Sequence, residues 1–165
     1  MIVVSNASPL ISLAKVGYLH LLPGLFGQIS IAPEVHQEVV GAGGTRPGAI
    51  EIQNAGWSQI QAVKDTARLH RWQQTYHLGL GELATVILAQ ELRADLAIID
   101  ERAARLLATQ NGIKVIGCVG LLEIGHRQGR VIELRATYHK LLAHGVHIDR
   151  QILDHSLATF HLPSL

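Results

Sequence analysis

The sequence predicts an α/β fold built on one open, parallel β-sheet. Short apolar runs alternate with helical patterns through the first 117 residues, which favours β-α-β units. Apolar residues make up 48% of the chain and aromatic residues only 4%, so Leu, Ile, Val and Ala must form the core. That composition is typical of helices packed on a Val/Ile sheet. A chain of 165 residues can bury enough surface to fold as one domain, and we expect a single domain over residues 1–165.

Five short β-like runs, each bounded by Gly, Pro or an acidic residue, are the predicted strands. They cover residues 2–5, 28–32, 57–61, 96–99 and 114–117. Most of them are apolar throughout, as strands covered on both faces are.

Helical patterns fill the stretches between these strands. Ser8 followed by Pro9 indicates a helix start, and the predicted helix runs to about Val16. Ala32 and Pro33 repeat this arrangement before a helix over residues 34–40, and the glycine-rich stretch 41–48 is predicted to be a loop. The other predicted helices cover residues 49–55, 65–76, 82–93, 101–110, 119–127, 133–144 and 149–159. The helices of residues 130–165 should pack on the edge of the sheet.

Charge and cysteine content limit the classes of protein to consider. Fourteen Lys and Arg against thirteen Asp and Glu give a net charge of +1, so bulk charge does not identify a nucleic-acid binder. Cys118 is the single cysteine, which favours a reducing, cytoplasmic compartment. The first apolar stretch is interrupted by Asn6, Pro9 and Lys15, so we expect neither a signal peptide nor a membrane helix.

Polar residues follow the predicted strands at the edge where parallel sheets bind ligands. Asn6 follows the first strand, Asp100 follows the fourth, and Glu82 opens the helix that leads into the fourth. Glu38 lies about one and a half turns into the helix after the second strand. It should face the same edge if Val35 and Val39 face the sheet.

Each of these acids also has an ordinary structural interpretation when it is taken alone. Asp100 could be a helix N-cap, Glu82 an acid in a first helical turn, and Glu38 a solvated helical residue. Glu101, at a helix start, is expected to face solvent. The functional hypothesis depends on the joint placement of Asp100, Glu82 and Glu38 at one edge of the sheet. Carboxylates that share a cleft repel one another or bind a cation, and oxygen donors without His or Cys select Mg²⁺ or Mn²⁺.

Several sequence blocks, in this order and spacing, resemble the PIN-domain nucleases, which include the VapC-type toxins of bacterial toxin–antitoxin pairs. The first block is residues 4–11, which includes Asn6 and Ser8, and the second is residues 31–35 with Glu38. The remaining blocks are residues 78–82, 98–105 and 115–117 with Gly120. The chain looks closest to a largely uncharacterised branch of that superfamily.

The resemblance implies a PIN-like three-layer sandwich whose five-stranded parallel sheet has the order 3-2-1-4-5. It implies Mg²⁺- or Mn²⁺-dependent hydrolysis of RNA by a cytoplasmic enzyme. The implied catalytic residues are Asn6, Glu38, Glu82 and Asp100, of which Asn6, Glu82 and Asp100 hold the metal. The implied substrate-binding residues are Ser8, Arg102 and Arg105. By analogy with the family, an antitoxin protein and a second copy of the chain are expected partners, with the leucine-rich stretches 18–25 and 119–127 as candidate dimer faces.

Asn6 departs from the family pattern, because most PIN domains carry a metal-binding Asp at this position. An amide oxygen can still bind a hard cation, but the site loses one negative charge. The alternative function is therefore a catalytically weakened PIN-like module that binds RNA or protein. A receiver-like domain is disfavoured, because its phosphoacceptor Asp would follow a central strand and no threonine-then-lysine pattern follows at later strand ends.

Overall fold

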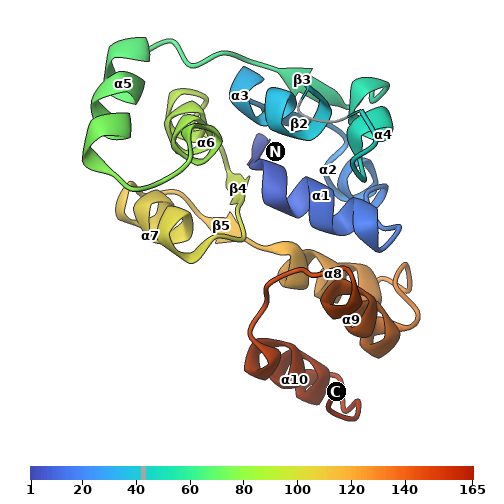
Figure 1. Cartoon of the computed structure of the whole chain (residues 1–165). Helices are drawn as coiled ribbons and strands as arrows, with labels where there is room; N and C mark the ends of the chain where they lie inside the picture. The colour runs from blue at the N-terminus through green and yellow to red at the C-terminus, as the bar shows by residue number, and fades with distance from the viewer. Residues whose placement is uncertain (42–43) are drawn as a thin grey trace.

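The computed structural model of the chain describes residues 1–41 and 44–165. It contains one five-stranded sheet in which every paired strand is parallel and the order is β3-β2-β1-β4-β5 (Figure 1). The strands are β1 (Val3–Ser5), β2 (Ile29–Ile31), β3 (Ser58–Ile60), β4 (Leu96–Ile98) and β5 (Val115–Ile116). The expected strand order is confirmed, and each strand lies inside its predicted run.

The helices follow the predicted pattern with shifted ends. The N-terminal helices are α1 (Ala7–Lys15), α2 (Leu21–Phe26), α3 (Pro33–His36), a π-helical turn η1 (Gln37–Gly41) and α4 (Ala49–Gln53). The next are α5 (Thr66–Thr75), α6 (Leu80–Glu91) and α7 (Arg102–Gln110). The C-terminal helices are α8 (Cys118–Arg127), α9 (Leu134–Ala143) and α10 (Arg150–Thr159).

One predicted helix start is wrong, and a second predicted helix changes type partway along. Asn6, in extended conformation, is the N-cap of α1, so Ser8 lies inside the first turn. Pro9 is tolerated there because the first four N–H groups of a helix have no partner within it. The helix predicted over residues 34–40 is instead the short α3 followed by the π-helical turn η1. Within the predicted glycine-rich loop, residues 42–43 lie outside the described part of the chain.

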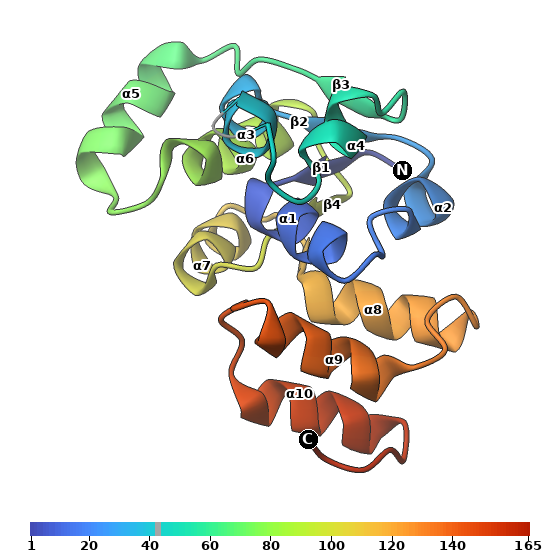
Figure 2. The ribbon, with the colours of Figure 1, turned by 45° about the vertical axis from the view of Figure 1, so that its right-hand side comes forward.

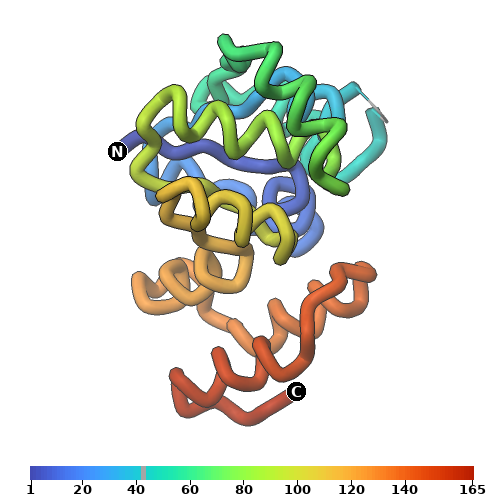
Figure 3. The backbone as a smooth tube through the Cα atoms, turned by 90° about the vertical axis from the view of Figure 1, so that its left-hand side faces the viewer, coloured from blue at the N-terminus to red at the C-terminus, as the bar shows by residue number. Residues whose placement is uncertain are grey.

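The sheet lies between two layers of helices. Helix α6 contacts β1 and β4 on one face, next to α7, whereas α2 contacts β2, and α1 and α4 lie on the opposite face (Figures 1 and 3). All three residues of β1 and of β2 are buried, as expected for central strands with helices on both sides. The reversal of strand order falls between β1 and β4, which is where α/β sheets bind ligands.

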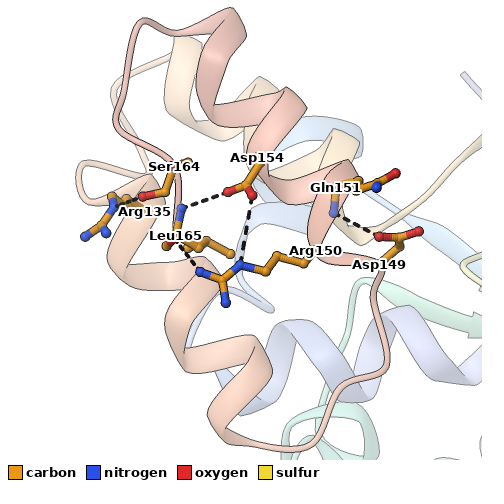
Figure 4. A network of polar contacts seen from close by, with 7 residues as sticks. All are labelled: Arg135, Asp149, Arg150, Gln151, Asp154, Ser164 and Leu165. Atoms are coloured by element: carbon orange, nitrogen blue, oxygen red, sulfur yellow. Dashed lines mark hydrogen bonds and ion pairs between the residues drawn. The ribbon is translucent and has the colours of Figure 1, made fainter.

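The three C-terminal helices pack one on another below the sheet layers (Figure 2), and α8 and α9 contact α1. The end of the chain folds back along α10 (Figure 4), where the main-chain N–H of Leu165 donates to Asp154 at 2.7 Å. The Arg135 guanidinium donates to the main-chain oxygen of Ser164 at 3.0 Å. These contacts tie α9 and α10 to the terminal residues.

Much of the two candidate dimer faces belongs to the core. Leu21 and Leu22 of α2 and Leu121 and Leu122 of α8 are all fully buried within the chain. A methyl group built on Gly125 of α8 would lie 3.2 Å from the Leu21 side chain, so the two helices pack closely against each other. Only the half-buried residues of these stretches, such as Leu25 and Val119, are left to contact a second copy. Among the described residues, no helix combines the length and the apolar character that crossing a membrane requires.

Candidate functional site

Asn6 lies at the carboxyl end of β1, beside the end of β4. Its main-chain N–H donates to the Ile98 carbonyl at 3.0 Å, which extends the pairing of these strands by one residue. The residue is only 2% exposed, and its Oδ1 is buried with no hydrogen-bond partner among the described residues. A buried amide oxygen without a partner is energetically costly, which marks Asn6 as a candidate ligand-binding residue.

Glu38 lies close to Asn6 across Gly81 of α6. A methyl group built on Gly81 would lie 3.2 Å from Glu38 Oε2 and 3.8 Å from Asn6 Oδ1. Val35 and Val39 are fully buried, which meets the condition for Glu38 to face this edge, and the Glu38 residue is exposed on the π-helical turn. Gly81 therefore leaves a gap between the two oxygens that any larger residue would fill. Turns of this kind often occur at functional sites.

Glu82 occupies the first turn of α6, one residue after Gly81. Its Oε2 accepts a hydrogen bond from the Gly79 N–H at 2.9 Å, so it caps the helix as the ordinary interpretation expects. Burial raises the pKa of Glu82, the Gly79 N–H lowers it, and the nearby carboxylates of Glu101 and Glu38 raise it further. Glu82 thus lies between two other acids along the sheet edge.

Asp100 lies two residues beyond the end of β4 and turns toward the start of α8. Its Oδ1 accepts a hydrogen bond from the Cys118 N–H at 2.6 Å. The Arg105 guanidinium is close to this carboxylate and donates to the Ile99 carbonyl at 2.8 Å. Burial raises the pKa of Asp100, while the Cys118 N–H and the Arg105 charge lower it. Asp100 is therefore not the N-cap of α7; Glu101 takes that position, with its carboxylate accepting from Ala103 N–H at 3.5 Å.

A cleft of about 830 Å³ opens beside Asp100. Its lining includes Ser8, Arg102 and Arg105, the three residues expected to bind substrate. Arg102 is exposed, whereas Arg105 is partly buried and holds the β4–α7 connection. Glu101 also lines this cleft, and its carboxylate is close enough to Glu82 to raise the pKa of Glu82.

Asn6, Glu38, Glu82 and Asp100, here called the acidic row, lie along the carboxyl edge of the sheet. The structure brings Asn6 and Glu38 together beside Gly81, with Glu82 near Glu38, and one carboxylate oxygen of Asp100, Oδ1, accepts from the main chain at the start of α8. In residues 1–41 and 44–165, no three Asp, Glu, His or Cys side chains lie close enough to hold a metal ion by themselves. Sequence reasoning did not include Glu101 in the site, although its place directly after Asp100 was a usable signal.

The oxygen donors of this row fit a hard cation. Asn6 Oδ1 is buried without a hydrogen-bond partner in residues 1–41 and 44–165, and Gly81 keeps open the space between it and Glu38. Amide and carboxylate oxygens are the donors that Mg²⁺ and Mn²⁺ prefer. The fit is closest at Asn6 and Glu38, and a cation there would also reduce the repulsion that raises the pKa of Glu82.

A family model described as a PIN domain matches residues 2–161 of the chain. No curated protein is similar enough to the chain to count as a match. The matched segment contains every strand, every helix and every residue of the acidic row.

Proposed function

The chain belongs to the PIN-domain family, a family of nuclease type, and on that premise we propose that it is a Mg²⁺- or Mn²⁺-dependent endoribonuclease. The observation that carries the proposal is the buried Oδ1 of Asn6, which has no hydrogen-bond partner in the described part of the chain and faces Glu38 across a glycine at the reversal of strand order. The composition of the chain does not by itself indicate RNA binding, because the net charge is only +1.

The residues of the row would have distinct roles in this reaction. Asn6, Glu82 and Asp100 would hold the cation, directly or through water, and Glu38, whose Oε2 lies beside Asn6, would be a further oxygen donor that completes the acidic shell. The cation supplies charge stabilisation at the scissile phosphate and lowers the pKa of an attacking water. Glu82 is suited to hold a proton, since burial and two neighbouring carboxylates raise its pKa. The Cys118 N–H and Arg105 fix the orientation of the Asp100 carboxylate.

Asn6 also supports a second candidate function. An amide in place of the usual Asp removes one negative charge from the cation site, and with it part of the affinity for a divalent ion. A chain with this change could retain RNA or protein binding without turnover. This binding-module hypothesis predicts RNA binding that does not depend on the acidic row.

A cleavage assay with a matched control separates these functions. The parent protein is incubated with a mixed RNA pool in EDTA, Mg²⁺ or Mn²⁺, beside Asp100→Asn and Asp95→Asn. Asp95 is a suitable control because it lies at the opposite end of β4 and, like Asp100, accepts one main-chain N–H at 2.6 Å, here from Ile2. Cleavage that needs the metal, survives in Asp95→Asn and is lost in Asp100→Asn supports the nuclease. Binding without cleavage under all conditions supports the binding module.

A role as the toxin of a toxin–antitoxin pair, in the cytoplasm, extends the same proposal. The match to the PIN family supports it, because that family includes the VapC-type toxins. Growth arrest on expression of the parent, but not of Asp100→Asn, would support this role. An antitoxin protein would be the partner that relieves the arrest, and the oligomeric state, expected to be a homodimer, is measurable by light scattering.

A further inference from the structure

We propose that Glu34 is a further ligand of the divalent cation, and that its carboxylate supplies the negative charge that Asn6 does not provide. This inference rests on the cation of the proposed nuclease function, and it concerns an acid outside the set that the family resemblance implies. Glu34 borders a pocket of about 550 Å³ between α3, η1 and the start of α6, which is lined by Pro33, Glu34, Gln37, Glu38, Leu80 and Gly81.

Glu34 lies in the first turn of α3, and one of its two carboxylate oxygens is withdrawn from solvent. Among the described residues, three side-chain polar atoms are buried without a hydrogen-bond partner: Asn6 Oδ1, Glu34 Oε2 and Ser58 Oγ. No Lys, Arg or His of residues 1–41 and 44–165 forms an ion pair with Glu34. Burying a carboxylate oxygen with neither a donor nor a counter-charge costs free energy, so this oxygen is suited to a cation.

Two other acids at this edge of the sheet have main-chain donors instead. Glu82 accepts from the Gly79 N–H at 2.9 Å, and Asp100 accepts from the Cys118 N–H at 2.6 Å. The main-chain N–H groups of the first turn of α3, by contrast, make no hydrogen bond to Glu34 Oε2. Capping of its own helix therefore does not explain why this oxygen is buried.

The pocket brings Glu34 next to the donors already described. Glu34 and Glu38 are four residues apart, about one helical turn, and both line it. Glu38 Oε2 and the 2% exposed Asn6 approach the same point, since a methyl group built on Gly81 would lie 3.2 Å from Glu38 Oε2 and 3.8 Å from Asn6 Oδ1. Gly81 itself lines the pocket. Two carboxylates and one amide oxygen suit Mg²⁺ or Mn²⁺, because such ions keep several waters as their remaining ligands.

The charge of Glu34 offsets the change at position 6. Asn6 stands where most PIN domains carry an Asp, so its place in the site brings an oxygen without a negative charge. Glu34 adds a carboxylate on the α3 side of Glu38. The affinity of an oxygen site for a divalent ion depends on how many of its ligands are charged. The chain therefore keeps its charge at the site by holding a carboxylate on α3 rather than at the end of β1.

The test measures Mn²⁺ binding rather than cleavage. Mn²⁺ is titrated into the metal-free parent, Glu34→Gln and Glu51→Gln, and unbound Mn²⁺ is measured by electron paramagnetic resonance. Glu51 is a matched control, because it is also an acid in the first turn of a short helix, α4, and is exposed outside the pocket. Glu34→Gln should weaken Mn²⁺ binding at least about tenfold, since losing even a hydrogen-bond partner of a metal ligand costs about 10–100-fold. Glu51→Gln should bind Mn²⁺ like the parent.

Two further measurements separate a ligand from a structural role. The metal-free Tm of Glu34→Gln should lie within about 2 °C of that of the parent, because Glu34 Oε2 has no hydrogen bond to lose in the described part of the chain. Asn6→Asp combined with Glu34→Gln should bind Mn²⁺ more tightly than Glu34→Gln alone, because a carboxylate returns to the site. Weaker Mn²⁺ binding that comes with a large fall in metal-free Tm, and that Asn6→Asp does not reverse, would overturn the assignment.

The outcomes keep the role of Glu34 and the nuclease function separate. Equal Mn²⁺ affinity of the parent and Glu34→Gln, with weaker binding by Glu38→Gln, removes Glu34 from the site and leaves the nuclease proposal standing. A parent protein whose Mn²⁺ binding depends on Glu34 but which cuts no RNA keeps Glu34 as a ligand and removes the nuclease proposal. A parent protein that binds no Mn²⁺ overturns both.

Discussion

Replacing Gly117 with alanine should disturb the orientation of Asp100 without straining the backbone. Gly117 has φ −108° and ψ −178°, an extended conformation that alanine adopts freely. The new methyl group, however, would lie 2.7 Å from Asp100 Oδ1 and 3.0 Å from an Arg105 nitrogen. The carboxylate must therefore move away from the Cys118 N–H that it accepts.

The size of the effect follows from that hydrogen bond. A bond between a main-chain N–H and a charged group contributes about 1.5–3 kcal/mol. Because burial raises the pKa of Asp100, moving the carboxylate toward water offsets part of the loss, so we expect the lower half of this range. A destabilisation of about 2 kcal/mol corresponds to a fall in Tm of about 4–8 °C for a chain of this size.

The effect is measured by thermal denaturation of Gly117→Ala, with Gly79→Ala as the matched control. Gly79 is also the N-cap of a helix, and its methyl group would meet Glu82 Oε2 at an ordinary 3.6 Å. Both variants carry the same change of a capping glycine, which costs about 0.5 kcal/mol. Gly117→Ala should therefore be the less stable variant by about 1.5–2 kcal/mol. Equal stability of the two would refute the role of Gly117 in holding Asp100.

Three further predictions concern the acidic row. Gly81→Ala should raise metal-free stability by about 0.5 kcal/mol, since alanine is the better helix former, and should reduce the stabilisation by Mn²⁺ seen in thermal denaturation. The parent itself should gain about 2.7 kcal/mol at a hundredfold excess of Mn²⁺ over its Kd, and an unchanged Tm would contradict a cation site. The raised pKa of Asp100 gives stability that is complete below its unfolded pKa and is lost as pH rises through the folded pKa. Asp100→Asn should therefore be more stable than the parent at about pH 7, with no gain below about pH 3, and urea titrations at both pH values measure this.

The sheet was predictable because its strands are short, apolar and regularly separated by helices. The ends of the apolar runs also give the ends of the strands. Because β1 and β4 are parallel, the residues that follow them, Asn6 and Asp100, were expected at the same edge of the sheet. Val35 and Val39 are both buried, which is the condition under which Glu38 was expected to face this edge.

The orientation of the site residues was not predictable from these patterns. Asp100 turns toward α8 because it accepts a hydrogen bond from the main-chain N–H of Cys118. Every residue type except proline carries such an N–H, so the amino-acid sequence does not show where this donor lies. Glu38 sits on a π-helical turn, which shifts its direction relative to the α-helix that the sequence predicted. The roles of Gly81 and Gly117 depend on close approaches between segments distant in sequence.

The most direct test of the proposed site is RNA cleavage in Mn²⁺ by the parent, Asn6→Asp and Asn6→Asp combined with Asp100→Asn. Asp at position 6 adds a carboxylate where Oδ1 has no hydrogen-bond partner among the residues that the structure describes, so it should tighten Mn²⁺ binding and raise the cleavage rate above that of the parent. The same change should lower stability without metal, because the new charge faces Glu38. The double variant should not cut. If Mn²⁺ binding improves but none of the three proteins cuts RNA, the chain is not a nuclease; if Mn²⁺ binding does not improve, Asn6 is not a ligand.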